Sequence, residues 1–440
     1  MSTNAQGVSS TATLWTDRDE PEWMAALRRK AFEEFSRAAW PTPQEEEWRR
    51  TDVTALDFGK YRLIQAEGGA VPAASQAGES DALSAQAIGD ESGLIRFQGG
   101  RCVLARIEPS LAAKGVRFLS LTEAIKDRNP AIEESFREAI DRSVNRFQSW
   151  HYSQWSHGAF LYVPQFLEIK DPFFIDFVET GAEAFSAPHV TVVLDKGARA
   201  VVIQRIASGD GGELLCNEGA DLKVGDGGAL EFVRVQDLNL KSRFFNNSSV
   251  GVARDGSLKH FEVVFGSRLH KSRLDCSING QGGEVHINGI YFAHKRQHMD
   301  IGTIQRHNAP NANSRAYYKG AVRDKAKTVY QGLIEVGIGA SQTDAYLKNK
   351  NLLLNDGARS DSIPMLKINN NDVKCSHGST TGKLNEEELF YLTSRGFPRT
   401  EAEKLLIAAF FEDVMESVHE AVKEEIRHTI LKRVGETTTA

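Results

Sequence analysis

The sequence predicts a mainly β fold, in which a core of short strands lies between a mixed N-terminal region and a helical C-terminal region. From about His157, short apolar runs alternate with Gly-Ala, Asp-Gly or Asn-Gly turns, and no helix-length periodic segment occurs before Asn385. Gly-Ala pairs begin at 181, 197, 219, 320, 339 and 357. Such an imperfect repeat, with two short strands and two turns in each step, is typical of a solenoid of stacked β rungs. A β-sandwich has similar strand counts, so this pattern alone leaves both architectures open.

The N-terminal region, residues 1–150, is expected to be mixed. The segment from Pro21 to Trp40 predicts an amphipathic helix, because apolar residues recur at near-helical spacing with charged residues between them. The apolar set is Trp23, Leu27, Ala31 and Phe35, and the charged set is Arg28, Arg29 and Glu33. Pro41 and Pro43 end this helix.

Residues 66–93 are rich in Ala, Gly and Ser and predict a flexible linker. Leu94–Phe97 and Cys102–Ile107 then form a predicted hairpin across a Gly-Gly turn. Two helices are expected after it, at 121–125 and 131–140. The β core is assigned to residues 151–384 and the C-terminal helical region to 385–440.

Two C-terminal helices carry clear end signals. Asn385 is a predicted N-cap, the three glutamates after it favour a helix N-terminus, and Gly396 suits the left-handed residue that ends a helix. Thr400 and Glu403 predict a capping box for the second helix. An apolar stripe follows it, formed by Ile407, Phe410, Phe411, Val414, Val418, Val422, Ile426 and Ile430. Such a stripe is usually core, but its place outside the predicted solenoid allows part of it to dock a partner.

Composition excludes several classes of function. The net charge of −6 and the absence of a long basic run disfavour nucleic-acid binding. No stretch approaches the roughly 18 apolar residues of a membrane span, and Met1–Thr13 has no secretory signal and is expected to be a disordered tail. The four cysteines, Cys102, Cys216, Cys276 and Cys375, are scattered, which suits a reducing cytoplasm and excludes a local zinc ribbon or ferredoxin-type cluster.

The stretch from Asp372 to Gly382 is the strongest candidate site. As a strand it places Val373, Cys375 and His377 on one face, so that a thiol and an imidazole can address one metal or sulfur atom. Gly378 and Gly382 are expected to break the strand and release the chain into a helix. The alternative is that Cys375 is a small core residue and His377 a hydrogen-bonded rim residue.

Two other motifs resemble functional sites, but neither is predicted to carry out a reaction or bind a metal. Gly378–Lys383 has the wrong spacing for a phosphate-binding P-loop, so no ATP hydrolysis is expected. Gln297, His298, Asp300 and His307 invite a metal site, but no further ligands can be named and a structural role is predicted.

Three ordered motifs carry a family resemblance. Leu352–Ala358, Asp372–Gly378 and Leu389–Gly396 resemble the C-terminal signature of the SufB/SufD family, scaffold subunits of SUF iron–sulfur cluster assembly. The resemblance is to the SufD branch, because Ala358 stands where the SufB branch has a cysteine. SufB is the nearest alternative. A β-helix carbohydrate-active enzyme is the alternative from another class, although no aromatic-lined acid pair supports it.

The resemblance implies a right-handed parallel β-helix core and a non-catalytic cytoplasmic scaffold. It implies pairing with SufB through the β-helix and binding of the SufC ATPase by the C-terminal helices, with no nucleic acid and no membrane insertion. Cys375 and His377 are the candidate metal residues for a transient iron–sulfur cluster at the SufB interface, with no cofactor held stably by this chain. The candidate partner contacts are Leu389, Phe390, Tyr391, Phe410, Phe411 and Val414. Removal of everything after Leu384 is expected to leave the β-helix folded, because a solenoid's contacts are internal.

Overall fold

The computed structural model describes residues 18–64, 91–127, 129–209 and 211–435. The predicted tail Met1–Thr13 and nearly all of the predicted linker 66–93 lie outside the described residues. Gly93, the last residue assigned to the linker, is described and begins a strand.

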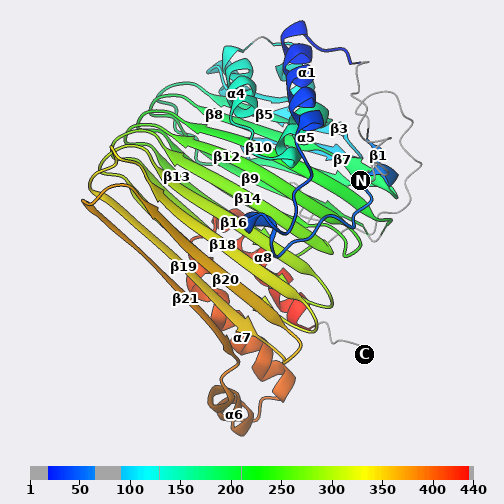
Figure 1. Cartoon of the computed structure of the whole chain (residues 1–440), viewed down its shortest axis with the longest axis vertical. Helices are drawn as coiled ribbons and strands as arrows, with labels where there is room; N and C mark the ends of the chain where they lie inside the picture. The colour runs from blue at the N-terminus through cyan, green and yellow to red at the C-terminus, as the bar shows by residue number, and fades with distance from the viewer. Residues whose placement is uncertain (1–17, 65–90, 128, 210, 436–440) are drawn as a thin grey trace, which may run out of the picture.

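The strands form two sheets that face each other, and each rung of the β-helix contributes one strand to each sheet (Figure 1). Sheet 1 contains β1 (Arg62–Leu63), β4 (Arg117–Ser120), β5 (His157–Val163), β7 (Ala184–Ser186), β8 (Pro188–Leu194), β10 (Leu214–Val224), β12 (Arg243–Val252), β14 (Leu269–Ile278), β16 (His298–His307), β18 (Lys327–Val336) and β20 (Arg359–Ile368). Sheet 2 contains β2 (Gly93–Gln98), β3 (Arg101–Ile107), β6 (Phe173–Glu179), β9 (Arg199–Ser208), β11 (Ala229–Asp237), β13 (Ser257–Val264), β15 (Glu284–Ala293), β17 (Asn313–Val322), β19 (Thr343–Leu353) and β21 (Val373–Lys383). All pairs are parallel except β2 with β3 and β4 with β5. The predicted mainly β fold with a parallel β-helix core is therefore confirmed.

The rungs are longer than the Gly-Ala spacing suggested. Arg243, Leu269, His298 and Lys327 occupy equivalent positions on successive strands, so one rung takes roughly thirty residues. The predicted steps were wrong because some glycines of the pattern lie inside strands. A Cβ on Gly320 would stand 1.8 Å from the Tyr291 ring, so this glycine marks a close approach of side chain to backbone.

The main core lies between the two sheets, and the outer faces are also covered. In β11, Leu230 and Phe232 point into this interior core, whereas Val233 and Val235 belong to a second core on the outer side of sheet 2. Strands buried on both faces have nearly continuous apolar sequences, which is why the core did not show a simple alternation.

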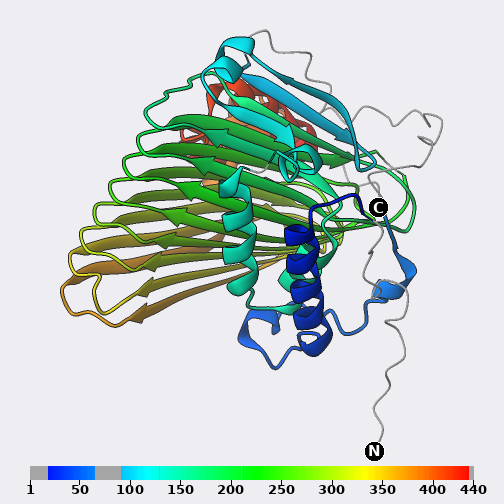
Figure 2. The same ribbon diagram turned by 90° about the horizontal axis from the view of Figure 1, so that it is seen from above.

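Two groups of helices lie on opposite sides of the β-helix (Figure 2). The N-terminal region contributes α1 (Glu22–Arg37), α2 (Pro109–Ala113), α3 (Leu121–Ala124), α4 (Pro130–Asp141), α5 (Arg146–Gln154) and the short turns η1 (Glu46–Trp48) and η2 (Phe58–Lys60). Of these, α1, α3, α4 and α5 pack on the outer face of sheet 1. The C-terminal α7 (Arg399–Met415) and α8 (Glu420–Gly435) pack on sheet 2, and α6 (Glu386–Ser394) extends beyond the last rung (Figure 1).

The N-terminal elements follow the prediction with one correction. The helix α1 ends at Arg37, and the hairpin β2–β3 turns at Gly99 and Gly100, whose φ angles of 54° and 82° favour glycine. Arg28, predicted on the solvated face, is buried: its guanidinium lies 4.0 Å from the Trp155 ring centroid and donates to Glu20 at 2.8 Å. An ion pair and an aromatic face together allow a buried arginine.

The C-terminal helices also differ in detail from the prediction. Asn385 accepts a hydrogen bond from the Glu387 amide at 2.9 Å, and Gly396 has a φ of 95°, as expected. The predicted capping box of Thr400 and Glu403 is wrong, because α7 begins at Arg399 and has Pro398 as its N-cap, with no side-chain cap. No helix in the described ranges has the length and hydropathy needed to cross a bilayer.

Candidate functional site at the open end of the β-helix

The β-helix ends in two strands with unpaired edges. Among the described strands, β20 pairs only with β18 and β21 pairs only with β19, whereas at the other end the sheets finish in the antiparallel edge strands β3 and β4. A strand edge of this kind presents a row of free backbone N–H and C=O groups, which another chain can pair with. The last rung therefore leaves two strand edges open to pairing.

His377 lies on β21, on the face that points toward the interior of the β-helix. Its register partner on β19 is Leu347, and Val373 and Cys375 on the same face pack against the interior core. His377 is nonetheless exposed, because no further rung of the described residues covers it. The prediction that Gly378 and Gly382 release the chain was wrong, since the strand continues through both glycines to Lys383.

The chemistry of this end is incomplete within the chain. Burial raises the pKa of the Cys375 thiol, and the nearby Asp344 carboxylate acts in the same direction, so the thiol is protonated at neutral pH. Metals bind the thiolate form. Over the described parts of the chain, no three His, Cys, Asp or Glu side chains are grouped so that they hold a metal ion. A metal held at the open end therefore needs ligands from elsewhere.

The six candidate partner contacts separate into exposed and buried groups. Phe390 and Tyr391 on α6 are 73% and 57% exposed, and Tyr391 also lines a shallow hollow between α6 and α7. Leu389, Phe411 and Val414 are buried inside this chain, and Phe410 is half-buried. The prediction that these buried side chains contact a partner is corrected, because they pack within the chain's own fold.

The stripe of α7 and α8 is part of the fold rather than a free surface. Phe411 and Val414 pack with the outer apolar residues of sheet 2. Polar contacts lie beside this apolar seam, since Lys319 of β17 pairs with Asp413 at 2.5 Å and Tyr317 donates to the same carboxylate at 2.8 Å. We call the exposed side chains at the tip, Phe390, Tyr391, Phe397 and Leu405, the tip patch.

The polar set around His298 is structural, as predicted. His298 Nε2 lies 2.9 Å from Thr51 Oγ1, and Asp300 accepts from both Thr51 and Lys271. These contacts attach the segment around Trp48 to the outer face of sheet 1. His307 lies on the inner face, where its Nε2 contacts Ser314 at 2.8 Å, so it cannot share a ligand with His298.

Sequence analysis missed a column of polar residues inside the β-helix. Arg234 donates to Asn246 at 2.9 Å and to Ser248 at 2.6 Å, and it lies 3.5 Å from Glu218 and 3.7 Å from Glu262. Burial raises the pKa of both glutamates, and the Arg234 charge opposes this rise. The two-residue period of a strand could have predicted this position. Leu230, Phe232 and Arg234 are every second residue of β11, so Arg234 lies on the same inner face as the two apolar residues.

Polar contacts continue inside the later rungs toward the open end. Tyr318 donates to Glu262 at 3.2 Å, Asn349 donates to Tyr291 at 3.2 Å, and Asn351 reaches Thr381 of β21 at 3.5 Å. Two buried imidazoles lie among the same rungs; burial lowers the pKa of His270 to about 3 and that of His260 well below its usual value. The interior is therefore a mixed core with specific hydrogen bonds.

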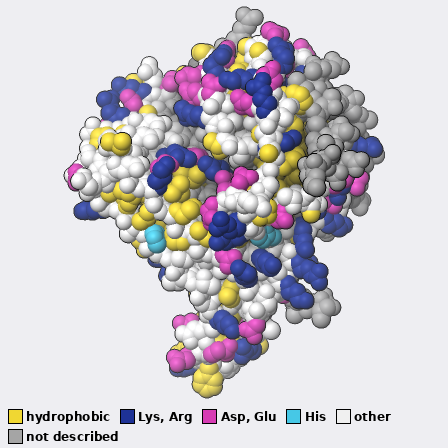
Figure 3. Space-filling view, in the orientation of Figure 1, with side chains coloured by type: hydrophobic (Ala, Val, Ile, Leu, Met, Phe, Trp, Pro, Cys, Tyr) yellow, Lys and Arg dark blue, Asp and Glu magenta, His cyan; other side chains and the backbone are white. Residues whose placement is uncertain are grey.

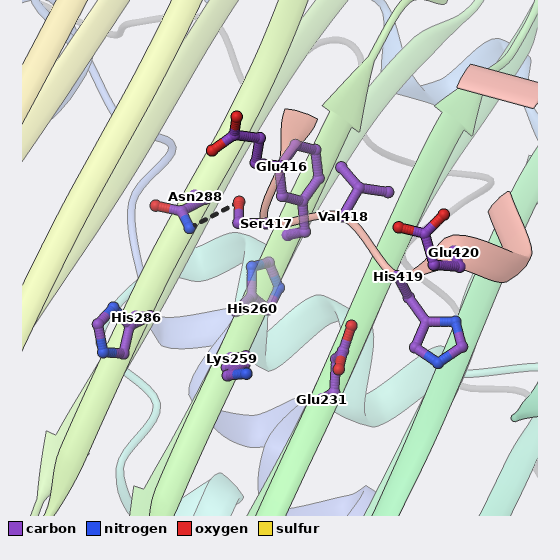
Figure 4. Close-up of a pocket in the computed structure, with 11 residues that line it drawn as sticks. Glu231, Lys259, His260, His286, Asn288, Glu416, Ser417, Val418, His419 and Glu420 are labelled. Atoms are coloured by element: carbon purple, nitrogen blue, oxygen red, sulfur yellow. Dashed lines mark hydrogen bonds between the residues drawn. The ribbon is translucent and has the colours of Figure 1, made fainter. Parts of the chain in front are cut away.

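A further cavity of about 320 Å³ lies between sheet 2 and the turn joining α7 to α8 (Figure 4). Asn288 donates to Ser417 across it at 2.9 Å, and His419 Nδ1 accepts from the Ala421 amide at 3.2 Å at the start of α8. Burial raises the pKa of Glu231 on the opposite wall, against the effect of His419. Charged and polar side chains of sheet 2 and of the helix turn line this cavity, together with Phe261 and Val418.

Together these features define a class of protein: a parallel β-helix with an unpaired strand end and an exposed helical tip. The chain belongs to the SufBD family, since residues 177–410 match the model described as SUF system FeS cluster assembly, SufBD core domain. The family's members are components of iron–sulfur cluster assembly.

Curated relatives agree with the family assignment. The iron–sulfur cluster assembly protein SufD of Escherichia coli is 25% identical over 92% of this chain and 91% of its own length. A SufBD family protein of Staphylococcus saprophyticus is 24% identical over 90% of this chain and 86% of its own. One from Mycobacterium tuberculosis is 28% identical over 62% of this chain and 70% of its own.

Proposed function

We propose that this chain is a non-catalytic, SufD-type scaffold subunit for de novo assembly of iron–sulfur clusters. The observation that carries the proposal is the open end of the β-helix, where the last strand of a SufBD-family core exposes His377 beside two unpaired strand edges. We divide the chain functionally into an N-terminal region (1–150), the β-helix core (151–384) and a C-terminal partner-binding region (385–440).

The open end is the proposed contact with a SufB-like paralogue. The backbone groups of β20 and β21 supply hydrogen bonds to a second β-helix, and exposed Leu366 and Ile368 supply apolar area beside them. In this arrangement the two β-helices share one edge-to-edge interface. The cysteine that the SufB branch has at the position of Ala358 then belongs to the partner.

The tip patch is the proposed contact with the SufC ATPase. It lies on α6, on α7 and on the turn between them, and its aromatic side chains are exposed, whereas the apolar stripe of α7 and α8 is buried except for the half-buried Phe410. Exposed aromatic residues of this kind are enriched at protein interfaces. The ATPase activity is supplied by that partner, because Gly378–Lys383 forms half of an extended strand and not a phosphate-binding loop.

His377 is the proposed cluster-contacting residue. A neutral imidazole nitrogen donates a lone pair to iron, and a thiolate of the partner supplies the charge that the protonated Cys375 does not. The cluster is cargo in this proposal, assembled at the interface and passed on.

Coexpression with a SufB-like protein and SufC tests the proposal. A tagged chain is expected to retain both partners through size-exclusion chromatography and to carry iron and acid-labile sulfide only with the SufB-like protein present. Stable iron on the isolated chain, or nucleotide hydrolysis lost on Lys383→Ala in the chain alone, contradicts it. A retained SufC with no SufB-like partner would reject the open-end interface while leaving the tip patch in place.

A further inference from the structure

One edge of the β-helix carries a ladder of cations. The segments that lead into β12, β14, β16 and β18 span 238–243, 265–268, 294–298 and 323–327, and they contain eight Lys or Arg residues against a single acid, Asp324. The turns on the opposite edge, at 253–256, 279–283, 308–312 and 337–342, contain only Arg254 and Asp255 as charged residues. In a chain with a net charge of −6, the cations of the turns of these four rungs are concentrated at one edge.

The backbone of the β-helix holds these cations in register. The Lys325 amide donates to the Lys295 carbonyl at 2.9 Å, and the His298 amide donates to the Arg268 carbonyl at 2.9 Å. Stacked rungs are about 4.8 Å apart, so the backbone atoms that carry neighbouring cations are held at close to that spacing. We call Arg268, Lys295, Arg296, Lys325 and Lys327 the basic ridge; all five are exposed. Figure 3 shows Lys and Arg side chains gathered at the right-hand ends of the lower strands.

The ridge is not neutralised by the part of the chain that the structure describes. Arg243, one position further along the edge, pairs with Glu213, whereas none of the five ridge residues forms an ion pair with a described acid. The Asp324 carboxylate accepts from the backbone amide of Lys295 at 2.7 Å. The pKa of Arg268 is lowered by burial and then by the charges of Arg296 and Arg243, which indicates a positive local field.

We infer that the basic ridge docks the carboxylate-rich face of a partner protein. Like charges fixed about 5 Å apart on a rigid edge repel one another, and facing carboxylates relieve this repulsion. Because the groups are exposed, the contact accelerates association and depends on salt more than it adds affinity.

Other anionic partners fit the ridge less well. Its four rungs cover about 15 Å, a short track for a nucleic-acid backbone, and no exposed aromatic side chain lies on it for base stacking. The large exposed apolar residues of the described chain lie elsewhere, for example Ile338 on the opposite edge, so the ridge has no membrane anchor. A carboxylate-bearing protein surface needs neither feature.

The test uses the full chain and a fluorescent peptide of alternating Glu and Ser, with the Gln-for-Glu peptide as a control. We compare wild type with Lys295→Glu/Arg296→Glu/Lys325→Glu. The matched control is Lys170→Glu/Lys196→Glu/Arg199→Glu, which reverses three exposed cations outside the ridge. Binding is followed by anisotropy between about 20 and 150 mM salt, and a melting curve verifies that each variant is folded.

The inference predicts that the acidic peptide binds wild type and not the Gln control, that the ridge variant weakens binding by about tenfold or more, and that the matched control stays within about twofold. An equal loss in both variants means that net charge alone is responsible and overturns the inference. Tighter binding of duplex DNA, or of vesicles containing phosphatidylserine, through the same three residues overturns it in favour of those partners.

Discussion

His377 of β21 and Leu347 of β19 occupy the same register position on adjacent strands, yet Leu347 is fully buried and His377 is exposed. Leu347 is covered by β21 on the next rung, whereas no described strand pairs with β21 on its other side. The imidazole of His377 is therefore open to solvent or to a partner, unlike the buried imidazoles of His260 and His270.

From this position we predict that His377→Ala leaves stability near wild type and impairs cluster formation. An exposed substitution of this kind changes the free energy of unfolding by less than about 0.5 kcal/mol. Iron and acid-labile sulfide on the purified complex, with the melting temperature, measure the two effects. Cys375→Ser is the matched variant and is expected to lower stability modestly, because it places a hydroxyl beside apolar neighbours. Normal clusters on His377→Ala and none on Cys375→Ser would assign the two roles the other way round.

The tip patch and the helical stripe can be separated by substitution. Phe390→Glu/Tyr391→Glu is expected to abolish SufC retention without changing the melting temperature, since both side chains are exposed. Phe411→Ala is expected to lower the free energy of unfolding by about 3–5 kcal/mol, because it leaves a cavity against sheet 2. A pull-down and a denaturant titration measure these effects. SufC retention by the double variant would remove the tip patch from the proposal.

Deletion of residues after Leu384 is now expected to do more than remove a partner site. The C-terminal helices cover Val233, Phe261 and Phe292 on the outer face of sheet 2. Their loss exposes this apolar strip, so we expect the truncated chain to aggregate, as seen in size-exclusion chromatography. A monodisperse truncated chain with native circular dichroism would restore the view that a solenoid's contacts are internal only.

Inside the β-helix, Arg234→Met is expected to cost about 3–5 kcal/mol of stability, because it leaves Glu218 and Glu262 buried without their shared cation. Arg234→Met combined with Glu218→Gln and Glu262→Gln is the control, and it is expected to recover much of the loss. Urea denaturation measures both. If the single variant is as stable as wild type, the interior column does not depend on this charge.

Because of His270, the stability of the β-helix is expected to fall as the pH falls. Its pKa of about 3 in the folded chain is below the unfolded value of 6.5, so the unfolded chain takes up the proton first. Its contribution to stability is complete above pH 6.5 and is lost as the pH falls toward 3, at up to about 1.4 kcal/mol per pH unit. His270→Phe, which keeps a ring stacked on Phe244, is expected to flatten the loss between pH 6.5 and 5.

The raised pKa values of Glu218 and Glu262 act in the opposite direction, since the unfolded chain then releases its protons first. The comparison between His270→Phe and wild type, rather than the absolute slope, therefore isolates the histidine. Identical slopes in denaturant midpoints across this range would contradict the assignment.

Local sequence signals predicted where helices and strands begin and end better than they predicted which residues pack together. The hairpin at Gly99 and Gly100 and the cap at Asn385 depend on neighbouring residues, and both were found. The face on which Arg28 is buried depends on Trp155, which is distant in the sequence, and periodicity misplaced it. The length of a rung was misjudged for the same reason. Gly320 leaves room for the ring of Tyr291 in the preceding rung, which is distant in the sequence.

In the candidate site, too, local features were predicted from the sequence and long-range ones were not. The alternation of Val373, Cys375 and His377 predicted which side chains share a face, and the register with β19 agrees. The exposure of His377 follows from the absence of a further paired strand beyond β21 among the described residues, a fact about rung number that no short motif contains. The alternation of strand residues places Arg234 on the inner face, but no interior arginine was predicted from the sequence.

The seam between the C-terminal helices and sheet 2 has a mechanical consequence. It contains side chains from strands as far apart as β2 and β19, with Leu94 at one end and Leu352 at the other. A load applied at α6 is therefore distributed as shear over the whole seam, and it does not separate one rung at a time.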